Sequence, residues 1–283
     1  MRVPGGARAN VVRRLLGVVL LALTVGCAGE TSRTPPASPL ASSGAASAAI
    51  HTGFSAPTGL AFAPDGTLYV SNWSGGTVER VTPDGARSTF AEVSAPAGLA
   101  LDTKGNLYVA SYSGDTVYRI SPAGRRQEFA TGFHTPTGIG FDSRGNLLVC
   151  NRASNEIMRV APDGTVSRVA GGLSTPVGVA EDARGTIFVA NYTGGTLSRI
   201  GRDGRVTTHS DDFDGLGVGL VVGRDNRLYA TDRAAGAIKR VDQDGRAVAV
   251  MSGLGSPVAL GVNAAGTIYT ATWDDGALYQ VPA

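Results

Sequence analysis

The dominant feature of the sequence is a repeat of about 40 residues that runs from Ser55 to the end of the chain. Each unit opens with a short apolar segment at or beside a glycine, and a turn containing glycine or asparagine leads into a β-rich run. A polar turn, a third run, a second glycine turn and a fourth run follow. The units open at Ser55, Ser94, His134, Ser174, Asp214 and Gly255. One such unit cannot bury its own apolar faces, so neighbouring units must supply one another's core.

The second run of each unit consists of β-branched, aromatic and aliphatic residues: Leu68–Val70, Leu107–Val109, Leu147–Val149, Ile187–Val189, Leu228–Ala230 and Ile268–Thr270. Short strands separated by Gly, Asp and Asn turns are typical of all-β architecture. Four strands in a unit of this length are typical of a propeller blade, whereas solenoid repeats usually contain one strand or a helical pair. The sequence therefore predicts an all-β fold, a six-bladed β-propeller of four-stranded blades.

The sixth unit stops after its third run, near Tyr279. The residues ahead of the first unit, Ala49–Phe54, match Phe129–Phe133, which close the second unit. We predict that this N-terminal strand supplies the missing fourth strand of the last blade, which removes the exposed edge of an open ring. The propeller domain would then span residues 49–283.

The N-terminal residues are predicted to be a leader. Residues 1–26 contain four arginines, no acidic residue and an apolar run of about a dozen residues, which is a signal-peptide pattern too short to span a bilayer. The leader ends in Leu23-Thr24-Val25-Gly26-Cys27, which resembles the lipobox of bacterial lipoproteins, although Thr24 stands where Leu is usual. The resemblance implies lipidation of Cys27; the alternative is an ordinary secretory signal with an unrelated cysteine.

Residues 27–48 are rich in Ala, Ser and Pro and are predicted to be a tether. Together these features predict an exported, membrane-anchored lipoprotein on the periplasmic or extracellular face of a bacterial envelope. Removal of the leader leaves 21 basic against 23 acidic residues, so we expect no nucleic-acid partner and no membrane contact beyond the anchor. We also expect a monomer.

The units share the approximate consensus Pro-x-Gly-Leu-Ala-x-Asp-x-x-Gly-Asn-Leu-Tyr-Val-Ala, and residues 94–133 and 134–173 match it best. Over residues 49–283 this consensus resembles NHL repeats and the senescence-marker-protein/gluconolactonase group. These proteins include sugar lactonases, lyases, sensor domains and scaffolds. The resemblance therefore implies the fold and leaves the activity open.

Lactonase-like members of this group hold a divalent cation, commonly Ca²⁺, over the central channel. Its ligands include an Asn or Asp directly before the glycine that opens the innermost strand and a Glu near the chain start. The matching positions here are Thr58, Ala97, Thr137, Val177, Val218 and Val258. A hard cation needs several oxygen ligands, usually including carboxylates, and these positions offer two hydroxyls. We therefore expect no metal and no cofactor.

Streptogramin-inactivating lyases have similar repeats, with a Pro-His-Gly motif and a Glu that closes a second strand. The His position is Thr, Ala or Val in the first four units, and no Glu closes a second run here. With neither base available for proton abstraction, the resemblance assigns no catalytic residue.

A ring of aromatic and basic residues follows the second runs. The loops on this one face begin with the pairs Asn72-Trp73, Ser111-Tyr112, Asn151-Arg152, Asn191-Tyr192, Asp232-Arg233 and Thr272-Trp273. Two Trp, two Tyr and two Arg would surround one mouth above polar groups, and these residue types are enriched at binding hot spots. We predict that these twelve residues bind a ligand; the alternative is that they only cover the blade tops.

Three functions remain open on this basis. The first is a non-catalytic sensor or binding propeller at the cell envelope that takes a small molecule or a protein at its mouth. The second is a lactonase, hydrolase or lyase with a divergent site centred on Asp232 and Arg233. The third is a purely structural envelope protein.

Asp102, Asp142 and Asp182 recur at one register and are predicted to cap turns, and Cys150 is predicted to be a buried, inert thiol.

Replacing Cys27 by Ser should yield protein without a lipid, because the lipobox resemblance implies that this cysteine is the residue that becomes lipidated. Intact mass and detergent partitioning of protein from a bacterial host would check this. A wild-type protein whose first residue carries no acyl mass would contradict the lipoprotein assignment.

Overall fold

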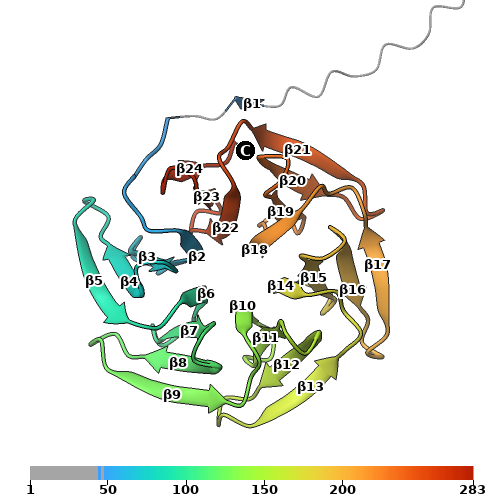
Figure 1. The fold of residues 1–283 in the computed structure, drawn as a ribbon, viewed down its shortest axis with the longest axis horizontal. Coiled ribbons are helices and arrows are strands. Elements are labelled where there is room, and N and C mark those ends of the chain that lie inside the picture. Colours follow the sequence, from blue (N-terminus) through green and yellow to red (C-terminus); the bar gives the residue numbers. More distant parts are fainter. Residues whose placement is uncertain (1–43, 46–47, 283) are drawn as a thin grey trace, which may run out of the picture. The chain divides into compact units, whose positions relative to one another are not determined.

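The structure is a computed structural model that describes residues 44–45 and 48–282, and every regular element within them is a β-strand (Figure 1). The predicted leader, Cys27 and most of the tether lie outside the described residues. No helix in the described part of the chain is long and apolar enough to cross a membrane. The prediction of an all-β fold is confirmed.

The strands form six sheets arranged as a ring (Figure 1). Blades 1 and 2 are formed by β2 (Pro57–Phe62), β3 (Leu68–Asn72), β4 (Thr77–Val81) and β5 (Arg87–Glu92), and by β6 (Pro96–Leu101), β7 (Leu107–Ser111), β8 (Thr116–Ile120) and β9 (Arg126–Thr131). Blades 3 and 4 are formed by β10 (Pro136–Phe141), β11 (Leu147–Asn151), β12 (Glu156–Val160) and β13 (Val166–Ala170), and by β14 (Pro176–Glu181), β15 (Ile187–Asn191), β16 (Leu197–Ile200) and β17 (Val206–Ser210). Blades 5 and 6 are formed by β18 (Leu216–Val222), β19 (Leu228–Asp232), β20 (Ala237–Val241) and β21 (Ala247–Ser252), and by β22 (Pro257–Val262), β23 (Ile268–Thr272) and β24 (Leu278–Gln280). Neighbouring strands of each blade are antiparallel, so the prediction of a six-bladed propeller is confirmed.

The glycine of the innermost strand lets adjacent blades approach each other closely. A Cβ added to Gly98 would lie 2.6 Å from the carbonyl oxygen of Thr137 in the next blade, and one added to Gly178 would lie 2.5 Å from that of Val218. Both distances are shorter than a van der Waals contact allows, so a side chain at either position would push two blades apart. The recurrence of Pro-x-Gly is therefore a packing requirement of the ring.

The core lies between the blades. The middle residues of the second strands, such as Val70, Val109, Val149 and Val189, have no exposed surface. Cys150 is also fully buried, and burial raises the pKa of its thiol above the ordinary range, which agrees with the prediction of an inert thiol.

The N-terminal segment closes the ring, but through a single bridge in place of the regular strand predicted for Ala49–Phe54. Ile50 N donates to Leu278 O, and Leu278 N donates to the carbonyl of His51, both at 2.8 Å. One further backbone hydrogen bond joins the segment to the last blade, from Phe54 N to Gly276 O at 3.0 Å. The partner strand β24 is only three residues long, which limits the pairing. A regular strand forms further upstream, where β1 (Gly44–Ala45) pairs in parallel with β21 of blade 5.

Side-chain packing strengthens this closing seam. Phe54 is buried in a cluster with Leu60 and Leu278, so it joins the first blade to the last. The guanidinium of Arg87 lies 4.0 Å from the centre of the Phe54 ring and donates to the carbonyl oxygens of Thr52 and Gly53. Apolar burial and a cation–π contact therefore supplement the few backbone hydrogen bonds of the seam.

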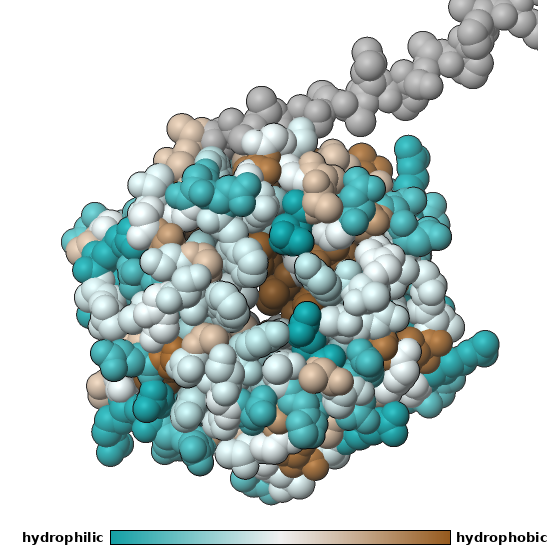
Figure 2. Space-filling model, viewed as in Figure 1, coloured by the Kyte–Doolittle hydropathy of each residue, from teal (hydrophilic) through white to brown (hydrophobic). Residues whose placement is uncertain are grey.

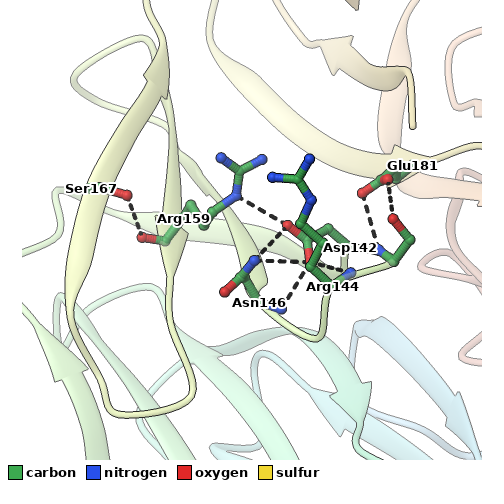
Figure 3. A network of polar contacts seen from close by, with 7 residues as sticks. Asp142, Arg144, Asn146, Arg159, Ser167 and Glu181 are labelled. Atoms are coloured by element: carbon green, nitrogen blue, oxygen red, sulfur yellow. Dashed lines mark hydrogen bonds and ion pairs between the residues drawn. The ribbon is translucent and has the colours of Figure 1, made fainter. Parts of the chain in front are cut away.

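The turns between first and second strands are capped by aspartates, as predicted from their register. Asp142 Oδ1 accepts hydrogen bonds from the backbone N–H groups of Arg144 (3.0 Å) and Asn146 (2.8 Å), and Arg159 pairs with the same carboxylate at 3.0 Å (Figure 3). Burial opposes ionisation of Asp142, but the hydrogen bonds and Arg159 hold its pKa below the ordinary value. Asp102 and Asp182 cap their own turns in the same way, so these carboxylates have a structural role.

Replacing Phe54 by Ala should reduce the free energy of unfolding by about 3–5 kcal/mol, because the change leaves a cavity in the core. It should also speed hydrogen exchange in β24, the strand that the closing segment contacts. Phe133→Ala is the matched control, since Phe133 ends the equivalent segment of blade 2 and is also buried.

Both variants should lose stability in urea titrations, but the fast exchange in β24 should appear only with Phe54→Ala. Equal exchange in β24 for the two variants would show that the N-terminal segment does not hold the ring closed.

Candidate functional site

Six side chains from the loops after the second strands surround a cavity of about 260 Å³ on the axis of the ring. We call them the ring residues: Trp73, Tyr112, Arg152, Tyr192, Arg233 and Trp273. Beneath them the cavity floor is formed by Thr58, Ala97, Thr137, Val177, Gly217, Val218 and Val258. In Figure 2 a hollow lies at the axis, with hydrophobic surface inside it and hydrophilic groups near its rim. The structure thus brings together the six aromatic and basic residues predicted to share one mouth.

The backbone of each loop is held by the residue that precedes an innermost strand. Trp73 N donates to Ala56 O (3.1 Å) and Tyr192 N to Thr175 O (2.9 Å), and the other four ring residues make the same bond. In five blades the accepting residue is a non-glycine in the left-handed region, for example Thr175 with φ 58°. This conformation costs about 1–2 kcal/mol for an L-residue, and here it occurs where a carbonyl must face the loop.

Aromatic contacts dominate the half of the mouth formed by blades 6, 1 and 2. The rings of Trp73 and Trp273 stack with centroids 6.1 Å apart and an angle of 23° between their planes. Tyr112 meets Trp73 edge-on at 6.0 Å. The indole N–H of Trp273 donates to Thr58 Oγ1 on the floor at 3.3 Å, which fixes the orientation of that ring.

The other half of the mouth, formed by blades 3 to 5, carries the two arginines. Arg152 Nη1 donates to Tyr112 Oη at 3.0 Å, and its guanidinium lies 5.9 Å from the Tyr192 ring. Arg233 Nη2 donates to Tyr192 Oη at 3.2 Å and lies 5.7 Å from the same ring. Tyr192 is therefore flanked by two guanidinium groups.

The ring residues form a chain of contacts with one gap. Within the described residues, no ring stacking, cation–π contact or hydrogen bond joins the side chains of Arg233 and Trp273. At this junction blade 5 reads Leu216-Gly-Val-Gly where blade 1 reads Pro-Thr-Gly, so it has one extra residue, Gly217, which lines the cavity. Sequence reasoning missed Gly217, although the change in motif length was visible.

The polar residue before each ring residue was predicted to contact the ligand, but it lies outside the cavity lining. Asn72, Ser111, Asn151, Asn191, Asp232 and Thr272 are all buried, and none lines the cavity. Asn72 Oδ1 accepts from Ser55 N (3.0 Å) and Asn191 Oδ1 from Ser174 N (3.2 Å), in both cases at the start of the same blade. These groups hold the loops in place, so the proposal of ligand contact is carried forward for the six ring residues alone.

Residues 44–281 match the model of the virginiamycin B lyase family. The chain belongs to this family. Among solved structures it is similar to the virginiamycin B lyase from Staphylococcus aureus, with 16% identity, a TM-score of 0.65, and 81% of this chain and 85% of that chain covered. A search of curated proteins found no match.

Two further structures have the same fold. A gluconolactonase from Xanthomonas campestris is 18% identical, with a TM-score of 0.74 over 83% of this chain and 88% of that chain. The calcium-binding protein regucalcin from Agrobacterium tumefaciens is 15% identical, with a TM-score of 0.73 over 84% of this chain and 94% of that chain. At such identities the likeness establishes the propeller fold alone, and it supports the resemblance to gluconolactonase-like propellers.

The cation site of the calcium-binding relatives does not fit this cavity floor. Its only side-chain oxygens are the neutral hydroxyls of Thr58 and Thr137, which donate to Ala56 O (3.0 Å) and Pro176 O (3.2 Å). Within the residues that the structure describes, no three His, Cys, Asp or Glu side chains lie close enough to hold a metal ion. Neutral hydroxyls among alkyl groups do not offset the dehydration of a divalent cation.

Of the two residues on which the enzyme alternative centres a divergent site, Arg233 lines the cavity and Asp232 does not. The Asp232 carboxylate is fully buried, pairs with Lys239 Nζ at 2.8 Å and accepts from the backbone N–H groups of Asp214 and Gly215. Lys239 lies where blade 1 has Glu79, which accepts from Asn72 Nδ2 at 2.8 Å. In blade 5 the acid Asp232 thus has the basic partner Lys239, and in blade 1 the amide Asn72 has the acidic partner Glu79.

This pairing predicts a compensating double substitution. Asp232→Asn should lower the free energy of unfolding by about 3 kcal/mol, because it leaves the Lys239 ammonium without its carboxylate. Adding Lys239→Glu should restore at least half of the loss by recreating the Asn72–Glu79 pair. Urea unfolding of both single variants and the double variant forms the cycle, and strictly additive losses would contradict the pairing.

Proposed function

We propose that the protein is an exported, ligand-binding member of the virginiamycin B lyase family that takes a small molecule into the mouth cavity. The observation that carries this proposal is the convergence of all six ring residues on one cavity with an apolar floor. A cavity with a few directed polar groups is the usual form of a small-molecule site. Its volume lies just below the usual range of about 300–1,000 Å³, which favours a small ligand or one flat group of a larger molecule.

The exposure of the aromatic ring residues supports binding. Trp73 and Trp273 each keep 37% of their surface exposed, and Tyr192 keeps 44%. Most other large apolar side chains of the propeller are buried, so these rings offer the apolar area that a ligand would cover. Covering such area contributes about 25 cal/mol per Å².

We further propose that the cavity carries out no proton transfer between ligand and protein carboxylates or imidazoles. Its lining contains no His, Asp or Glu. The positions that match the lyase His and Glu hold other residues, as described above. The protein would act by binding, and a protein partner at the same mouth is the other possible occupant.

For its location we propose the bacterial cell envelope. The cationic, apolar leader and the Gly26-Cys27 junction support export and a lipid anchor. The anchor would tether the propeller to a membrane surface on the periplasmic or extracellular side.

A lyase activity is the second candidate, and the family match favours it. The structure offers one suitable arrangement of residues: the phenol oxygens of Tyr112 and Tyr192 each accept a hydrogen bond from an arginine. A positioned phenol hydroxyl is one of the groups that can transfer a proton to or from a substrate. The S. aureus family member was crystallised with quinupristin as a catalytically inactive variant, so quinupristin is the substrate to test.

The two tryptophans of the chain are both ring residues, so fluorescence excited selectively at tryptophan reports on the mouth alone. A ligand screen should give saturable changes in this fluorescence. For any ligand found, Trp73→Ala should weaken binding at least tenfold by calorimetry, because one face of the cavity is lost. Val166→Ala is the matched control, since Val166 is 37% exposed on the outer strand β13 and should leave affinity unchanged.

The enzyme alternative is tested by incubating the protein with quinupristin or gluconolactone, with and without chelator. We expect no loss of either compound by liquid chromatography. Turnover of quinupristin that is abolished by Tyr192→Phe would replace the binding function with lyase chemistry. Turnover of the lactone that is lost on addition of chelator would instead support a metal-dependent lactonase.

A further inference from the structure

The mouth is divided into an aromatic half and a cationic half. Trp73, Trp273 and Tyr112 contact one another on one side, and Arg152 and Arg233 flank Tyr192 on the other. A ligand in a cavity of about 260 Å³ would contact both halves at once. Its chemistry should therefore match the division.

The cationic half carries positive charge without a counter-ion. Arg152 and Arg233 line the cavity, and its lining contains no carboxylate. In the part of the chain that the structure describes, neither guanidinium forms an ion pair, and Asp232, the acid adjacent in sequence, pairs with Lys239. Two uncompensated charges facing one cavity attract an anion.

The geometry of the arginines leaves donors for such an anion. Each guanidinium has five N–H donors in a planar fork that matches a carboxylate. Within the described residues, each donates one hydrogen bond, to the phenol oxygen of Tyr112 or of Tyr192. These bonds also orient both guanidinium groups, so less rotamer entropy is lost when an anion binds.

The aromatic half fits a flat apolar group. The two indole rings are nearly parallel and partly exposed, and the floor beside them includes Ala97, Val218 and Val258. Stacking on such rings is favourable for a planar ring system and adds to the burial of its area. An aliphatic anion would leave this half of the cavity unused.

We infer that the ligand is a small planar aromatic acid, with its ring system on the two tryptophans and its anionic group on Arg152 and Arg233. This inference rests on the proposed function and specifies its ligand class. It requires both properties in one molecule, so removing either the charge or the ring should weaken binding.

Calorimetry on the purified mature protein with three probes tests the inference: naphthalene-2-carboxylate, naphthalene-2-carboxamide and acetate. The carboxylate should bind at least tenfold more tightly than its neutral amide, and acetate should show no measurable binding. Raising the salt concentration from 50 to 300 mM should lower the affinity for the carboxylate and leave the affinity for the amide unchanged, because salt screens charges at an open mouth.

Arg152→Gln and Arg233→Gln should each reduce the preference for carboxylate over amide at least threefold, with amide affinity kept within twofold. Arg152→Lys and Arg233→Lys should retain part of the preference, because the charge remains but the fork is lost. Arg205→Gln, on an exposed turn of blade 4, is the matched control and should have no effect.

Equal affinity for carboxylate and amide, or acetate binding as tight as the carboxylate, would overturn the inference while leaving ligand binding in place. Failure of both naphthalene probes, with binding of a cationic or aliphatic ligand in the fluorescence screen, would overturn it in the same way. If no ligand of any class changes the fluorescence, the proposed function itself is wrong.

Discussion

The close contact between neighbouring innermost strands determines most of this structure. Gly98 approaches the backbone of Thr137 in the next blade so closely that a single methyl group would not fit, and the same holds for Gly178 against Val218. Each such contact sets the distance between two blades and therefore the width of the central cavity. The last blade has Ala259 at the matching position, beside the seam that the N-terminal segment closes.

The same contact positions the mouth cavity. The residue directly before each of these glycines forms the floor, and the strained residue before the strand accepts the N–H of a ring residue. Each blade therefore contributes a floor residue and a ring residue at nearly fixed positions. The fold supplies the frame, and the identity of these residues decides what the mouth can bind, which is how one propeller frame accommodates lyases, lactonases and calcium-binding proteins.

The fold and the ring were predictable because both follow from periodicity. Second strands of a propeller all end on one face, so Trp73 and its five equivalents had to meet there. The role of the preceding polar residues was not predictable from the same pattern, since it depends on side-chain direction: Asn72 turns towards the N–H of Ser55, 17 residues away. The structural role of Asp232 was unpredictable for the same reason, because its carboxylate forms an ion pair with Lys239 across a hairpin. The closing strand was overestimated because its partner β24 is only three residues long, so that one bridge forms in place of a full strand.

The electrostatics of the mouth separate this chain from the lactonase-like propellers that it resembles. The resemblance implies that their cavity floor carries acidic or amide groups around a cation, so an anionic or polar substrate would be held through that ion. Here the floor is neutral, and positive charge comes from Arg152 and Arg233 one layer above it. A fixed guanidinium offers directed hydrogen bonds but has no open coordination position with which to activate water. On our proposal, two guanidinium groups that hold an anion would stand in place of an electrophilic metal centre, and such a mouth would favour recognition over hydrolysis.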